Sequence, residues 1–189
     1  VYRLTADGVE TPVALERFNG DFHFHVAALE TDGPVRMTLS APSVALDKLR
    51  IRPRRWNIAI ERREHEADFT LLPDQKLVVE IPGQRPLLLF AIPPESNPRS
   101  SADNNVVYYG PGEHDAGRIW LRSGQTLYLA AGARLRGTVY AFEANDVAIR
   151  GRGVLDARGL TSADKRIHGI LFERCKNVSV EGIQLRTGD

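Results

Sequence analysis

The sequence predicts an all-β fold: an N-terminal antiparallel β-sandwich over residues 1–98, followed by the first coils of a parallel β-helix over residues 106–189. The first observation is a set of short, alternating apolar runs in the first half, and the second is a strand pattern that repeats in the second half. The third is a shift in composition: ten of the eleven prolines lie at or before Pro98, and twelve of the sixteen glycines lie at or after Gly110. The polar, turn-rich residues 99–105 are predicted to be a linker.

The overall composition is that of an ordinary folded chain. The 189 residues include 25 basic and 24 acidic side chains, a net charge of +1, and 42% are hydrophobic. This balance favours neither nucleic acid nor an anionic membrane as a partner, and no run approaches the roughly 20 apolar residues of a membrane span. Cys175 is the single cysteine, which excludes an internal disulfide and a cysteine-based zinc site. We expect no cofactor and no bound metal.

The first half contains short runs in which apolar and polar residues alternate. Val35–Leu39 and Trp56–Ile60 have this period of two, and Leu77–Ile81 is a more apolar version. In a fourth run, Phe22–Val26, His23 and His25 share one face of a strand, which we expect to be solvated because no third metal ligand is evident. Turn-forming residues separate the runs, a spacing typical of an antiparallel sandwich.

The second half repeats a polar turn followed by apolar, polar and apolar residues. The pattern occurs at Gln125–Leu129, Asn145–Ile149 and Lys176–Val180, and corresponding apolar positions are 20 and then 31 residues apart. A polar loop over residues 157–167 accounts for the additional eleven residues. Repeats of this length, built from short strands, indicate a solenoid in which each coil packs on the next. The glycines predicted to lie at corners of this solenoid are Gly151, Gly153 and Gly182.

The last strand pattern is like those before it, and nothing near Asp189 resembles a polar cap. We therefore expect further coils beyond this residue. The first residue is Val1 rather than methionine, so the sequence is interpreted as a piece of a longer protein.

The candidate ligand-binding residues lie around the inserted loop. Arg166 and His168 near its end are predicted to reach a groove, where His168 would bind a hydroxyl or a carboxylate. Asp156, at the start of the loop, is interpreted as a turn residue that binds its own backbone. The basic residues before Trp56 are interpreted as salt-bridged surface because acidic residues follow closely.

Several stretches together resemble the first coils of right-handed parallel β-helix glycoside hydrolases, which are pectin-lyase-like in fold. The matching stretches are VVYYGPGEHDAGRIWLRSGQTLYLAAGARLRGTVYA, NDVAIRGRGVLDARG and HGILFERCKNVSVEGIQLR. The resemblance is to the polygalacturonase family 28 and the dextranase–isopullulanase family 49. The first half, which ends in LVVEIPGQRPLLLFAIPPE, resembles the β-sandwich that precedes the helix in family 49.

The resemblance implies the N-terminal part of an enzyme that cleaves a polysaccharide, such as polygalacturonan or dextran, by inverting hydrolysis. Its partner would be a polysaccharide or oligosaccharide, its role polysaccharide degradation in carbohydrate metabolism, and its location secreted or periplasmic. These families use aspartates on later coils in motifs that do not occur here, so the catalytic residues are expected beyond Asp189 and the chain alone is expected to be inactive. The alternatives are a polysaccharide lyase and a non-catalytic carbohydrate-binding or structural β-helix.

Overall fold

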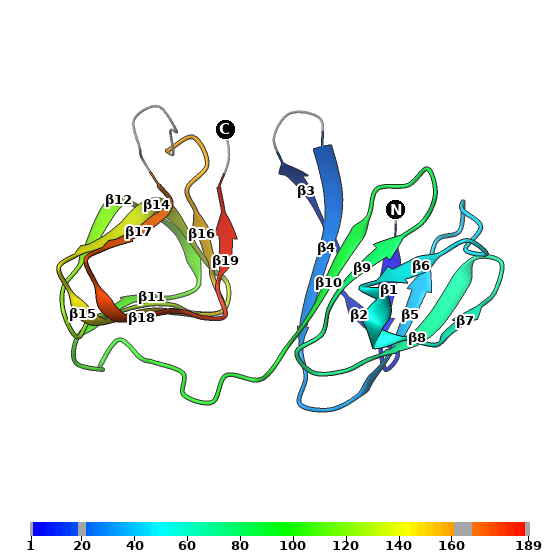
Figure 1. The fold of residues 1–189 in the computed structure, drawn as a ribbon, viewed down its shortest axis with the longest axis horizontal. Coiled ribbons are helices and arrows are strands. Elements are labelled where there is room, and N and C mark those ends of the chain that lie inside the picture. The colour runs from blue at the N-terminus through cyan, green and yellow to red at the C-terminus, as the bar shows by residue number, and fades with distance from the viewer. Residues whose placement is uncertain (1, 19–21, 161–167, 188–189) are drawn as a thin grey trace. The chain divides into compact units, whose positions relative to one another are not determined.

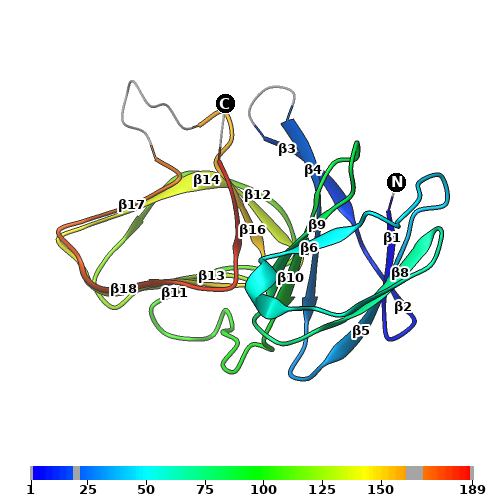
Figure 2. The ribbon, with the colours of Figure 1, turned by 45° about the vertical axis from the view of Figure 1, so that its right-hand side comes forward.

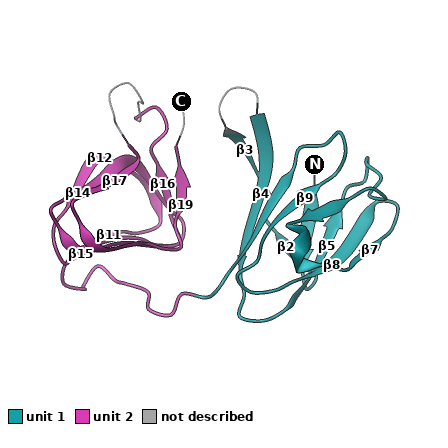
Figure 3. Ribbon diagram, viewed as in Figure 1, with its two compact units in different colours: residues 1–94 teal, residues 95–189 magenta. Residues whose placement is uncertain are grey.

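The computed structural model describes residues 2–18, 22–160 and 168–187. Within these ranges the regular structure consists of strands and one short 3₁₀ helix, η1 (Arg54–Trp56), so no helix is long and apolar enough to cross a membrane. The chain forms two compact units, residues 1–94 and residues 95–189 (Figure 3). This division falls four residues before the end of the sandwich expected from composition, which was Pro98.

The first unit is a sandwich of two five-stranded sheets (Figures 1 and 2). One sheet contains, in spatial order, β2 (Val9–Thr11), β1 (Arg3–Ala6), β5 (Val35–Ser40), β8 (Glu66–Leu71) and β7 (Ile60–Arg62). The other contains β3 (Ala14–Phe18), β4 (Phe22–Glu30), β10 (Leu87–Ile92), β9 (Lys76–Glu80) and β6 (Arg50–Arg52).

Alternation along the strands builds the core between these sheets. In β5, Val35, Met37 and Leu39 are buried, and in β10 the same period buries Leu87 and Leu89. Removing these side chains from water is the main favourable contribution to folding of the unit, about 1.5–3 kcal/mol for each fully buried large side chain. The expected period of two is therefore confirmed in β5.

One strand pair departs from the antiparallel pattern, since β10 runs parallel to β4. The other strand pairs described in this unit are antiparallel. A parallel pair needs a long crossover, and here the chain supplies one by passing through the first sheet between β4 and β10.

The histidine face of β4 points into the sandwich rather than into solvent. Ala27, which shares this face, is buried, and His25 is in register with buried Leu87. The His25 ring packs edge-on against Tyr2 with the ring centroids 4.7 Å apart. Burial lowers the pKa of His25, with smaller contributions from the N-terminal amine and Arg85. The prediction of a solvated histidine face is wrong for His25. This residue is in register with Leu87 of the parallel partner β10, whose side chain is in the core, so the His25 side chain also faces the interior of the sandwich.

The run Trp56–Ile60 was also expected to be a strand, and this prediction is wrong. Trp56 ends the 3₁₀ helix η1, and Asn57 follows with a left-handed φ of 44°. This conformation breaks the alternation, so β7 begins only at Ile60.

The second unit is a parallel β-helix with three sides (Figures 1 and 2). Its first side consists of β11 (Val106–Tyr109), β13 (Thr126–Leu129), β15 (Asn145–Gly151) and β18 (Lys176–Val180). The second side consists of β16 (Val154–Asp156), β19 (Gln184–Arg186) and the first halves of β12 (Gly112–Leu121) and β14 (Ala133–Phe142). The third side consists of β17 (Ile170–Glu173) and the second halves of β12 and β14.

Inward-facing residues of successive coils stand in register. Leu127 pairs with Val107 on one side and with Ile149 on the other, and Leu127 and Ile149 are fully buried. The repeat identified in the sequence aligned Leu127 with Val147, which lies two residues before Ile149, the actual partner of Leu127. Because side chains alternate with a period of two, this difference leaves the same residues inside the solenoid.

The inserted loop leaves the solenoid at the corner between the second and third sides. Both β16 and β17 pair with β14, and the chain between them is eleven residues longer than the matching corner of β14. The predicted insertion is thereby confirmed, although residues 161–167 lie outside the described residues.

The inward-facing residues of the last coil are partly open to solvent. Val178, Val180 and Leu185 are 40–46% exposed although they stand in register with buried residues. Within the part of the chain that the structure describes, no further strand packs on β18 and β19.

Glu95, in the segment before the first coil, forms a hydrogen bond with the outer face of the first side. Tyr108 and Tyr128 occupy neighbouring outward positions there, and their rings stack with centroids 5.6 Å apart. The Tyr128 hydroxyl donates a hydrogen bond of 2.7 Å to the Glu95 carboxylate. Burial and this carboxylate raise the pKa of Tyr128 to about 12.

Gly151 lies where the chain turns from the first side to the second. It has a φ of 119°, and a Cβ at this position would overlap the carbonyl oxygen of Leu129 in the coil beneath. Gly153 and Gly182 likewise face backbone atoms of the neighbouring coil. The predicted corner glycines are therefore required by the close stacking of backbones.

Substituting Gly151 tests this constraint. We expect Gly151→Ala to lower the free energy of unfolding by at least about 3 kcal/mol, because backbone strain and steric overlap combine. The matched control is Gly124→Ala, which also has a positive φ, 76°, but open space around its Cβ; it should cost about 1–2 kcal/mol. Urea denaturation of both variants measures the difference, and equal losses would contradict the proposed overlap.

Removing the Tyr128 hydroxyl gives a pH-dependent prediction. The folded pKa is above the ordinary value near 10, so the stabilisation is complete below pH 10 and is lost as the pH rises through about 12. We expect Tyr128→Phe to reduce the free energy of unfolding by about 1–2 kcal/mol at pH 8. This gap should close between pH 10 and pH 12 in denaturation curves, and a gap that stays constant over this range would contradict the assignment.

Candidate functional site

An outward row of large side chains crosses the third side of the solenoid. Trp120, Tyr140 and Leu171 are neighbours in register on β12, β14 and β17. Ile119 and Leu121 flank Trp120 and are buried, so alternation directs the indole outward. Trp120 is 59% exposed.

The aromatic rings of this row are held in a defined arrangement. The Trp120 and Tyr140 centroids are 5.2 Å apart at an interplanar angle of 37°. The Arg118 guanidinium lies 5.1 Å from the centre of the Tyr140 ring, a cation–π distance. We call Arg118, Trp120 and Tyr140 the aromatic platform.

The end of the inserted loop contacts this platform through its backbone. The Tyr140 hydroxyl lies 3.3 Å from the carbonyl oxygen of His168, to which it donates, and accepts from the His168 N–H at 3.4 Å. These contacts hold the loop against the platform, and Tyr140 is only 8% exposed as a result.

The two predicted ligand-binding residues have different outcomes. The structure places the His168 backbone beside the Tyr140 hydroxyl, and the residue is exposed. Arg166 lies outside the described residues. A binding role for either residue stays a prediction.

Asp156, at the other end of the loop, is held by a neighbouring arginine. The Arg158 backbone N–H and Nε donate to Asp156 Oδ1 at 3.1 and 2.9 Å, and Arg158 Nη2 bonds to Oδ2. The hydrogen bonds from Arg158 lower the pKa of Asp156, against the effect of burial, with a further contribution from Arg186. This carboxylate is ionised at neutral pH and acts as the turn residue predicted from the sequence.

The third side offers binding groups rather than a pair of catalytic acids. On β17, Glu173 alternates with inward-facing Phe172, and it is the one carboxylate among the described outward positions of this side. Within the same described residues there is no group of three or more potential metal ligands. The side therefore presents the exposed Trp120 ring and the Arg118 guanidinium to a bound molecule.

The sequence reasoning missed Arg118, Trp120 and Tyr140. A signal was present, because RIWL alternates polar or aromatic residues with two aliphatic ones and stands within the repeating half. Alternation within one strand predicts which residues face outward. It does not predict which outward residues of successive coils become neighbours, because their pairing depends on the register between strands.

No family model matches the sequence, and no curated protein matches it either. The fold places the chain in a structural class in which a β-sandwich is followed by a parallel β-helix. Among solved structures, the chain is similar to Dex49A from Penicillium minioluteum, a dextranase of glycoside hydrolase family 49. The TM-score is 0.57 at 12% sequence identity, over 95% of this chain and 53% of that chain.

This likeness confirms the fold expected from the sequence resemblance. The chain spans about half the length of the solved chain that it matches.

The assignment of Asp156 to a structural role can be tested by substitution. We expect Asp156→Asn to lower the free energy of unfolding by about 1 kcal/mol at pH 7, an effect kept small by the solvent exposure of Arg158. Because the folded pKa is depressed, this stabilisation is present above pH 4 and is lost as the pH falls further. Thermal denaturation at pH 7 and pH 3 measures the change.

The control is Asp115→Asn, which breaks an exposed ion pair with Arg136. Its effect should stay within about 0.5 kcal/mol at either pH. A stabilising effect of Asp156→Asn at pH 7 would overturn the structural assignment.

Proposed function

We propose that this chain is the N-terminal part of a polysaccharide-cleaving glycoside hydrolase and that its third side binds the glycan. One observation carries the proposal: Trp120 is exposed beside Tyr140 on a parallel β-helix, where the inserted loop meets the third side. The structural likeness to a dextranase supports the same class of activity.

The platform matches the chemistry of a sugar. One face of a pyranose ring is lined by C–H groups, which pack on aromatic rings, while its hydroxyls need donors and acceptors at the edge. Trp120 supplies such a ring, and the Arg118 guanidinium over the neighbouring Tyr140 ring supplies a donor at its edge. The exposed indole contributes little to the core, so its outer face is open to such a ring.

The proposed reaction is hydrolysis with inversion, as the sequence resemblance implies. Such enzymes place two carboxyl groups roughly 6.5–9.5 Å apart, one to protonate the leaving oxygen and one to activate water. Among the described outward residues, the third side carries one carboxylate, so the acid and base belong to coils that would continue this side. The 189-residue chain is thus proposed to bind glycan without cleaving it, and the whole protein to act outside the cytoplasm.

Substituting Trp120 tests the platform. We expect Trp120→Ala to weaken binding of dextran oligosaccharides or oligogalacturonides at least tenfold, which corresponds to about 1.4 kcal/mol. Trp120→Phe, which keeps an aromatic ring, should recover most of the affinity. Glu113→Gln, on the first half of the same strand, should leave binding unchanged. Affinity electrophoresis or calorimetry measures these effects.

The choice of glycan separates the two resembling families. If the site binds an acidic glycan through Arg118, Arg118→Ala should weaken oligogalacturonide binding more than dextran binding. If the site binds a neutral glycan, the variant should weaken the binding of both glycans alike. Failure of both glycans to bind, or equal binding by Trp120→Ala and the unmodified chain, would contradict a glycan site on this side.

A further inference from the structure

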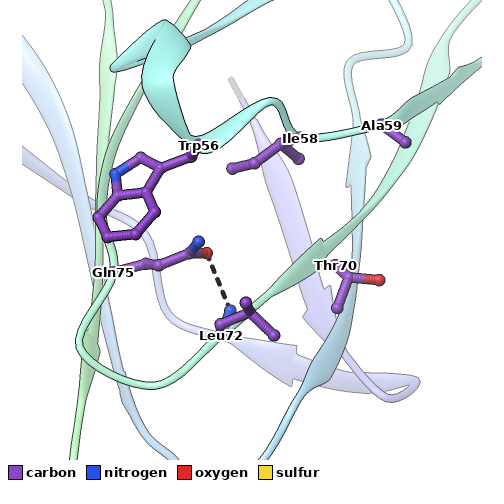
Figure 4. Close-up of a pocket in the computed structure, with 6 residues that line it drawn as sticks. All are labelled: Trp56, Ile58, Ala59, Thr70, Leu72 and Gln75. Carbon is purple, nitrogen blue, oxygen red and sulfur yellow. Dashed lines mark hydrogen bonds between the residues drawn. The ribbon is translucent and has the colours of Figure 1, made fainter.

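The sandwich unit has its own hollow around the second tryptophan (Figure 4). This hollow, which we call the Trp56 hollow, has a volume of about 200 Å³. It lies between the η1–β7 segment and the turn from β8 to β9. Its lining residues are Trp56, Ile58, Ala59, Thr70, Leu72 and Gln75.

Two turns fix the walls of the hollow. The Trp56 N–H donates to the Pro53 carbonyl at 3.2 Å, and the Asn57 N–H donates to the Arg54 carbonyl at 3.0 Å. Across the hollow, the Gln75 N–H donates to the Leu72 carbonyl at 3.2 Å, and the Leu72 N–H donates to Gln75 Oε1 at 2.9 Å. These hydrogen bonds fix the backbone of both walls of the hollow.

The apolar walls of the hollow are left open to solvent. Trp56 is 42% exposed and Leu72 is 43% exposed, so a large part of each side chain does not pack against the core. The Arg55 guanidinium lies 5.4 Å from the Trp56 ring centre, which helps to hold the indole in place. Exposed apolar surface grouped in a concave site is typical of ligand binding.

The lining also indicates the chemistry of the ligand. None of the six lining residues is charged, so the walls favour a neutral molecule, and the nearby Arg55 guanidinium is engaged with the Trp56 ring. Gln75 is 2% exposed, and with its amide oxygen bonded to Leu72, its amide nitrogen is the donor that remains at the hollow (Figure 4). A volume near 200 Å³ is below the roughly 300–1,000 Å³ of pockets for drug-sized ligands, and it suits one ring.

We propose that the Trp56 hollow is a second carbohydrate-binding site, which takes a single neutral sugar residue of a glycan chain. The apolar walls pack against the C–H face of the ring, and the Gln75 amide donates to a hydroxyl. The proposal does not depend on the aromatic platform of the solenoid.

The chain is well suited to a direct test, because it contains two tryptophans and each lies at one of the two sites. In the variant Trp120→Phe, Trp56 is the single fluorescent indole, and in Trp56→Phe it is Trp120. Both variants of the 189-residue chain are titrated with isomaltotriose as the neutral probe and with trigalacturonate as the charged one. We expect a saturable change in Trp56 emission with isomaltotriose, and an apparent affinity for trigalacturonate at least fivefold weaker.

Two further substitutions in the Trp120→Phe background locate the ligand. Gln75→Glu keeps the acceptor for the Leu72 N–H but replaces the amide donor, and Ala59→Phe fills the hollow from an exposed position. Each should weaken the isomaltotriose response at least fivefold, while Leu15→Phe, an exposed site on β3, should not change it. Circular dichroism confirms that the variants are folded.

The outcomes separate this proposal from the proposed function. A Trp120 response with a silent Trp56 overturns the second site alone, and a Trp56 response with a silent Trp120 overturns the platform alone. Silence of both overturns both. A Trp56 response that is unaffected by Ala59→Phe, or that is stronger with trigalacturonate, also overturns the neutral-sugar site.

Discussion

In-register stacking of parallel strands is the constraint on which the solenoid depends. Each coil donates and accepts backbone hydrogen bonds with the coil on either side, so a residue's position along one coil determines its neighbours in the next. The same stacking brings backbones so close at one corner that Gly151 has no space for a side chain. It also makes Leu127 and Ile149 neighbours in the interior.

The outward platform follows from this constraint. Trp120 and Tyr140 are twenty residues apart in the sequence, and they meet because β12 and β14 pair in register. Nothing in the core requires aromatic residues there, since the inward positions on both sides of Trp120 are aliphatic. The strands thus supply a rigid base for the rings, and the contact between Tyr140 and His168 joins the loop to that base.

Much of the fold could be predicted from residue patterns, because alternation and turn residues act locally. The runs around Met37 and Leu127, the glycine corners and the length of the inserted loop were all legible in the sequence. The errors came from features that act over a distance. His25 faces inward because β10 pairs with β4 from more than fifty residues away, and Trp56 leaves the strand pattern at the left-handed Asn57. The platform was missed for the same reason, since register is a property of two strands together.

The inserted loop has a consequence for how such a scaffold can diversify. Its eleven additional residues enter and leave at one corner, and β16 and β17 still pair with β14 as though the corner were short. Length and composition can therefore vary at this corner without disturbing the coils, because loop closure costs little more as a loop grows. The solenoid is a natural host for loop exchange: grafting a different segment between Arg158 and His168 should alter what the neighbouring surface recognises, while buried Ala157 and the close-packed Gly169 keep the coils in place.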